Sequence, residues 1–140
     1  MAASKPPPGG RQIAVIGAGS CGAAEAELAF RVGELLAAAG QVLLCGGLGG
    51  VMTAAARGAR ARGGVNIGIV PGPGRGQANP YIVHEIVTNL GHCRNFVIIH
   101  SADGVIALPG AEGTLAEIAI ARKLGKPLVA VGPCWEFLPG

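Results

Sequence analysis

Short apolar runs alternate along the chain with longer segments in which apolar residues recur every three or four positions. The short runs are Gln12–Ile16, Val42–Cys45, Asn66–Val70, Gly104–Leu108 and Pro127–Val131, with a further extended stretch at Ile82–Thr88. Nearly continuous apolar runs of this length predict strands that are buried on both faces of a parallel sheet.

The periodic segments between the strands predict helices. The apolar positions of the first helix are Leu28, Val32, Leu35, Leu36 and Ala39. Further helices are expected from about Gly50 to Arg62, Gly91 to Ser101 and Thr114 to Leu124, and a loop from Pro71 to Pro80. Repeated strand–helix–strand order predicts a single Rossmann-like α/β domain, with a doubly wound, mainly parallel sheet flanked by helices.

The ends of the chain differ in composition from this alternating part. Residues 1–10 include the run Pro6–Gly10 and bury too little apolar surface to offset ordering, so we predict a disordered leader. Residues 11–140 are then expected to form one Rossmann-like domain, since their number is usual for a single domain. No closing helix is predicted in Trp135–Gly140.

Charge and hydropathy narrow the possible partners. The formal net charge is +3, and Arg57, Arg60 and Arg62 lie on one predicted helix, either as a solvated face or as an anion-facing patch. No stacking aromatic residues accompany these arginines, so we expect no nucleic-acid partner. No signal peptide or membrane-spanning run is present, which predicts a cytoplasmic protein without a membrane partner.

The cysteines and histidines do not have the spacing of metal ligands. They are Cys21, Cys45, Cys93 and Cys134, and His84, His92 and His100. Scattered cysteines in a cytosolic chain are expected to be reduced and mostly buried, and the histidines fall on different predicted elements. We therefore predict no metal site.

The first glycine-rich turn, Gly17–Gly22, follows a strand and opens a helix. It fits the Gly-x-Gly-x-x-Gly pattern, which makes Gly17, Gly19 and Ser20 candidate ligand-binding residues. A dinucleotide site also needs an acidic residue at the end of the second strand, where this chain has Leu44–Gly47. An NAD(P)-binding oxidoreductase is therefore only a lesser alternative.

The second turn is richer in glycine and also precedes a helix. Gly46, Gly47, Gly50 and Met52 are candidate ligand contacts, because glycine lets backbone N–H groups approach a ligand closely. Tight packing of helix against strand is the alternative explanation. No Gly-Lys-Ser or Gly-Lys-Thr follows either turn, so a P-loop ATPase is not supported.

The third turn, Leu108–Thr114, combines Pro109, Gly110 and Gly113 with a threonine at the expected start of a helix. Free N–H groups and the helix dipole make such a start an anion site, although Thr114 could instead be only an N-cap. Glu117 lies one turn further on, on the same helical face.

A carboxylate beside a phosphate pocket opposes anion binding unless a cation lies close to it. Arg94, on the preceding helix, is the candidate cation, because its guanidinium can bind a phosphate or a carboxylate through two hydrogen bonds. A surface salt bridge is the alternative role for Arg94.

Taken together, these motifs resemble the LOG-like Rossmann superfamily, from about Gln12 to Val131. The superfamily includes cytokinin riboside monophosphate phosphoribohydrolases, proteins misannotated as lysine decarboxylases, and molybdenum cofactor carrier proteins. The resemblance implies that the proline–glycine turn binds a nucleotide phosphate, and that Arg94 and Glu117 act on a glycosidic bond in the hydrolases.

Ala111 and Asn95 replace a glycine and a lysine that are usual in that pattern. The segments Val70–Pro73 and Ile86–Gly91, followed by Arg94 and Asn95, look like the cofactor-carrier branch.

The resemblance to this branch favours a nucleotide-like ligand-binding protein, a carrier of the molybdenum cofactor, which needs no cofactor of its own. The alternative is a nucleoside 5′-monophosphate phosphoribohydrolase, with Arg94 and Glu117 catalytic and a nucleoside monophosphate as ligand; lysine decarboxylation is not expected. The apolar run Phe96–Ile99, together with the resemblance, predicts a homodimer or homotetramer.

Overall fold

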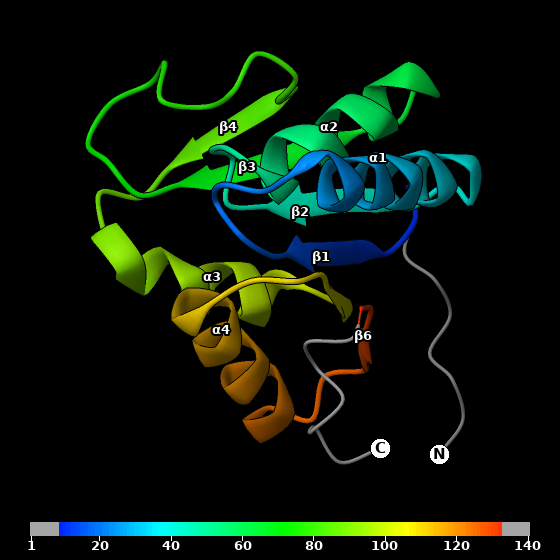
Figure 1. The fold of residues 1–140 in the computed structure, drawn as a ribbon. Coiled ribbons are helices and arrows are strands. Elements are labelled where there is room, and N and C mark those ends of the chain that lie inside the picture. Colours follow the sequence, from blue (N-terminus) through cyan, green and yellow to red (C-terminus); the bar gives the residue numbers. More distant parts are fainter. Residues whose placement is uncertain (1–8, 133–140) are drawn as a thin grey trace.

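The computed structural model describes residues 9–132, and these form one parallel six-stranded sheet with the strand order β4-β3-β2-β1-β5-β6 (Figure 1). The strands are β1 (Gln12–Ile16), β2 (Val42–Cys45), β3 (Asn66–Val70), β4 (His84–Val87), β5 (Gly104–Ala107) and β6 (Leu128–Ala130). Every strand pair is parallel. The predicted α/β fold class and the predicted strands are confirmed.

Helices cover both faces of this sheet: α1 (Ala23–Ala38) and α2 (Val51–Ala61) lie on one face, and α3 (Arg94–Ser101) and α4 (Glu112–Lys123) on the other (Figure 1). A single 3₁₀ turn, η1 (Gly91–Cys93), leads into α3. The last helix starts two residues before the predicted start, so the N-cap is Ala111 and Thr114 lies inside the first turn. The proposed N-cap role for Thr114 was therefore wrong.

The central strands β1 and β2 contribute side chains to two cores. Val15 and Leu43 pack in the layer beneath α1 and α2, whereas Ala14, Ile16 and Leu44 pack in the layer with α3 and α4. Successive side chains of a strand point to opposite faces, and both faces are covered here, which explains why the strands are continuous apolar runs.

α1 and α2 approach closely because glycines lie where they cross. A Cβ at Gly58 would lie 2.0 Å from the carbonyl oxygen of Phe30, and a Cβ at Gly33 would lie 2.1 Å from that of Ala55. Both positions therefore require glycine for packing. The sequence pattern does not contain this information, since it gives no distance between the two helices.

Asn66 is the fully buried polar residue at the start of β3. Its amide donates to the carbonyl oxygens of Tyr81 (2.9 Å) and Ala56 (3.4 Å), and its Oδ1 accepts from the N–H of Val83 (2.8 Å). Buried polar groups are stabilising only when they are paired in this way. Asn66 thus fixes the segment before β4 against β3 and α2.

The apolar run Phe96–Ile99, in the helix predicted from about Gly91 to Ser101, is only partly buried against the sheet. Ile98 and Ile99 are buried in the core of their own subunit, whereas Phe96 is half-exposed. Burial against the sheet explains only part of the run, and oligomerisation stays a prediction. Residues 1–8, Cys134 and the segment Trp135–Gly140 lie outside the described residues. Among residues 9–132, no helix has the length and apolarity to cross a membrane.

The strand order places a crevice between β1 and β5. From β1 the chain proceeds through β2 and β3 to β4 on one side, and then returns to β5 on the other side of β1. The connections that leave β1 and β5 therefore diverge to opposite faces of the sheet. Ligands of open α/β sheets bind at such switch points, outside the carboxyl ends of the strands.

Candidate functional site

A pocket of about 350 Å³ lies at this switch point. It brings together ten of the predicted site residues from four separate segments: Gly17, Gly19, Ser20, Gly46, Met52, Arg94, Asn95, Gly113, Thr114 and Glu117. Val15, Ile16, Ala18 and Ala111 also line it but were not predicted. Three of these four lie next to predicted glycines, and this adjacency could have identified them.

The other four predicted residues shape the turns and do not line the pocket. A Cβ at Gly110 would lie 2.2 Å from the hydroxyl oxygen of Thr114, and one at Gly50, where φ is +60°, would lie 2.3 Å from the carbonyl oxygen of Ala18. Gly47 has a φ of +76° and packs against Val70. The carbonyl of Pro109 accepts a hydrogen bond of 3.0 Å from the N–H of Ala18. For Gly47, Gly50 and Gly110, local packing explains the glycine.

Arg94 is the buried cation of the pocket, with 9% of its surface exposed. One guanidinium nitrogen, Nη2, donates to the carbonyl oxygen of Gly46 at 3.4 Å, and Nη1 donates to Oδ1 of Asn95. Gly46 leaves room for this contact, because a Cβ there would lie 2.7 Å from Nη2. Burial lowers the pKa of Arg94, an effect that the negative charge of Glu117 opposes.

The guanidinium of Arg94 is also incompletely satisfied. Its Nε is buried and has no hydrogen-bond partner among the described residues. A buried donor without a partner costs free energy and is uncommon in a folded protein. The residue that carries this orphan donor also lines the pocket.

Glu117 is a buried carboxyl group in the same pocket, with 8% of its surface exposed. Burial raises its pKa from 4.5 to about 7, although the positive charge of Arg94 acts in the opposite direction. No described residue donates a hydrogen bond to its carboxylate. Glu117 is therefore a group that exchanges a proton near neutral pH, beside a buried cation.

The N-terminus of α4 forms another part of the pocket wall. No side chain caps Ala111, so the N–H groups of the first turn are available to a ligand. Gly113 and Thr114 of that turn line the pocket, and Thr114 is 4% exposed. Free N–H groups and the positive end of the helix dipole are suited to a phosphate.

The end of β2 does not supply the carboxylate of a dinucleotide site. Cys45 ends the strand, is fully buried, and has a pKa raised by burial to about 11, so it is a neutral thiol. The glycines Gly46 and Gly47 follow it. Within residues 9–132, no group of three or more His, Cys, Asp or Glu residues could hold a metal ion.

The arginines of α2 have partners within the chain. Arg57 lies 4.9 Å from the centre of the Phe30 ring, Arg60 donates to the carbonyl oxygen of Pro80 at 3.4 Å, and Arg62 pairs with Glu34 at 3.0 Å. These contacts favour the interpretation of the three arginines as a solvated helix face, and not as an anion-facing patch.

The fold and the pocket define a Rossmann-like α/β domain with a pocket of about 350 Å³ at its switch point. More specifically, the chain belongs to the SLOG cluster4 family, whose model matches residues 10–138. An uncharacterised protein of Archaeoglobus fulgidus is 47% identical over 122 residues, which cover 87% of this chain and 80% of the relative.

Two solved structures of molybdenum cofactor proteins are similar to this chain. The molybdenum cofactor binding protein from Rippkaea orientalis has a TM-score of 0.84 and 38% identity, covering 86% of this chain and 75% of that one. The molybdenum cofactor carrier protein from Chlamydomonas reinhardtii has a TM-score of 0.80 and 35% identity, covering 86% and 75%.

A more distant similarity concerns the fold alone. DNA processing protein A from Streptococcus pneumoniae has a TM-score of 0.76 and 22% identity, covering 90% of this chain and 52% of that one. Because a DNA-processing protein shares the fold, the expectation of no nucleic-acid partner stays a prediction.

Proposed function

We propose that this protein binds a phosphate-bearing, nucleotide-like ligand in the pocket between β1 and β5, and that it acts as a carrier of the molybdenum cofactor. The observation that carries the proposal is that Arg94 and the uncapped N-terminus of α4 line the same pocket, in a chain 38% identical to a molybdenum cofactor binding protein. Both features favour an anionic group.

The pocket fits such a ligand in size and in chemistry. A volume of about 350 Å³ lies at the lower end of the range for small-molecule sites, which suits one pterin or nucleoside with its phosphate. The first-turn N–H groups of α4 and the hydroxyl of Thr114 would hold the phosphate. Arg94 would balance its charge, and the glycine turn Gly17–Ser20 lets the backbone approach the ligand.

The carrier proposal can be tested by retention of the cofactor. Purified protein is mixed with molybdenum cofactor and passed through a desalting column, and the retained pterin is measured by fluorescence after oxidation. We expect the wild type to retain it. The Arg94→Ala variant should bind about 10- to 100-fold more weakly, as expected for the loss of a charge-assisted hydrogen bond of about 1.5–3 kcal/mol.

Arg62→Ala is the matched control, because Arg62 pairs with Glu34 on the surface and does not line the pocket. It should retain the cofactor like the wild type. Absence of retention by the wild type, or equal retention by the Arg94→Ala variant, would contradict the proposed site.

Glu117 favours a second candidate function, a nucleoside 5′-monophosphate phosphoribohydrolase. A carboxyl group with a pKa of about 7 can both accept and donate a proton at neutral pH, as general acid–base catalysis requires. Release of free base from AMP or a cytokinin ribotide, abolished by Glu117→Gln, would support this activity. No release across a panel of nucleoside monophosphates would exclude it for those substrates.

A further inference from the structure

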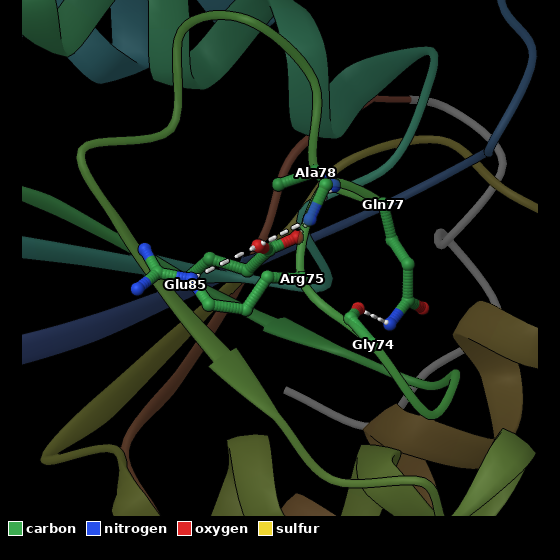
Figure 2. Close-up of polar contacts among 6 residues, drawn as sticks. Gly74, Arg75, Gln77, Ala78 and Glu85 are labelled. Atoms are coloured by element: carbon green, nitrogen blue, oxygen red, sulfur yellow. Dashed lines mark hydrogen bonds and ion pairs between the residues drawn. The ribbon is translucent and has the colours of Figure 1, made fainter.

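The connection between β3 and β4 crosses from one strand to the next without a helix, and two side chains, Glu85 of β4 and Gln77 of the loop itself, fix its backbone. Glu85 of β4 accepts hydrogen bonds from two backbone N–H groups of the loop, that of Gly76 to Oε1 and that of Ala78 to Oε2, each at 2.8 Å. Figure 2 shows the Glu85 carboxylate beneath Ala78 and next to Arg75. These bonds lower the pKa of Glu85.

Gln77 closes the other half of the loop. Its Oε1 accepts a hydrogen bond of 2.6 Å from the N–H of Gly72, and its Nε2 donates to the carbonyl oxygen of Gly74 (Figure 2). A Cβ at Gly72 would lie 2.4 Å from Oε1 of Gln77, so the glycine permits this contact. The loop 71–80 is thus ordered by its own polar contacts more than by apolar burial.

The two ends of this loop form hydrogen bonds to two backbone segments that lie close in sequence to pocket residues. At its end, Asn79 donates from its backbone N–H to the carbonyl oxygen of Gly47 (2.8 Å) and from Nδ2 to that of Leu48 (2.8 Å). At its start, the carbonyl of Pro71 accepts from the N–H of Gly91 at 3.0 Å.

Each of these two backbone segments leads to one partner of a hydrogen bond inside the pocket. Arg94 follows Gly91 by three residues, at the beginning of α3, and its guanidinium donates to the carbonyl of Gly46, the residue before Gly47. The loop therefore holds both the backbone that carries Arg94 and the backbone that carries its acceptor. We infer that Glu85 and Asn79 are positioning residues, which order the loop 71–80 and thereby set the place of Arg94 in the pocket.

The inference rests on the proposed function in one respect: it expects residues outside the pocket to change the affinity for the molybdenum cofactor. We expect Glu85→Ala and Asn79→Ala to weaken retention of the molybdenum cofactor about tenfold, within the range of coupling between residues of one hydrogen-bond network. Arg75→Ala is the matched control, because Arg75 is an exposed loop residue whose ion pair with Glu85 is 3.9 Å long. It should leave retention unchanged, as surface ion pairs contribute little.

A double-mutant cycle separates positioning from general destabilisation. If Glu85 acts through Arg94, then Glu85→Ala should weaken retention further by less than about twofold when Arg94 is already alanine. The same tenfold loss in both backgrounds would overturn the inference. Should Glu85→Ala fail to fold, Glu85→Gln serves instead, since its amide keeps one acceptor oxygen and should give an intermediate loss.

A ligand-independent measurement keeps the inference testable if the proposed function fails. In amide hydrogen exchange followed by NMR, Glu85→Ala should speed exchange at Ala78 and Gly91 while the core strands stay protected. Wild-type protein that retains no cofactor would contradict the proposed function alone. Unchanged exchange at Gly91 would overturn the positioning role.

Discussion

Replacing Glu117 with glutamine should make the protein more stable at alkaline pH. Glutamine has the shape of the protonated carboxyl group but cannot acquire the buried negative charge. Burial raises the pKa of Glu117 from 4.5 to about 7 in the folded protein, which corresponds to about 3 kcal/mol of free energy against the ionised form. This free energy is the cost of placing a negative charge on a buried carboxyl group.

The sign of the pH dependence follows from proton binding. Between pH 4.5 and about 7 the folded protein holds the Glu117 proton more often than the unfolded chain does, so rising pH favours unfolding. The contribution of this group to stability is complete below pH 4.5 and is lost as pH rises through 7. The Glu117→Gln variant should therefore exceed the wild type by about 3 kcal/mol at pH 8 and by less than about 1 kcal/mol at pH 5.

Urea unfolding followed by circular dichroism at pH 5 and pH 8 measures this difference directly. Glu112→Gln is the control, because it is the same substitution at an exposed position in the first turn of the same helix. It should change stability by a few tenths of a kcal/mol at both pH values. A Glu117→Gln variant that gains no stability at pH 8, or gains equally at pH 5, would refute the reasoning.

Other substitutions test packing and the pocket. Gly58→Ala should lower the free energy of unfolding by about 3 kcal/mol in urea titrations, because its Cβ meets the α1 backbone. Asn66→Ala should cost about 2–4 kcal/mol in the same assay, since it leaves buried backbone groups unpaired. Gly19→Val should fold normally but lose cofactor retention, as its nearest contact is Met52 at 4.0 Å in the pocket. Retention by the wild type should fall as pH rises through 7, when Glu117 becomes anionic, and the Glu117→Gln variant should remove that fall.

The apolar pattern predicts the order and positions of the strands, because a strand buried on both faces needs a continuous apolar run. The runs 12–16, 42–45 and 66–70 match their strands residue for residue. Helix starts are less accurate: a free N-cap has little side-chain signature, and Ala111 gives none. The predicted start of α4, at Thr114, is therefore two residues too late.

Most of the pocket residues could be predicted from the glycine motifs, because each motif follows a strand and the carboxyl ends of parallel strands meet at one edge of the sheet. The hydrogen bonds from the loop 71–80 to the backbone next to the pocket could not be predicted from the sequence. Asn79 and Leu48 are 31 residues apart and meet only through the path of the loop 71–80. The roles of Gly47, Gly50 and Gly110 depend on backbone conformation and contact distances, which the sequence does not contain.

A crystal structure of the protein with the molybdenum cofactor bound would test the central claim most directly. We predict that the phosphate lies in the pocket between β1 and β5, within hydrogen-bond distance of the N–H groups of Gly113 and Thr114 and close to Arg94. A phosphate bound elsewhere, such as beside the apolar groove of Val32, Leu36 and Val129, would contradict the account.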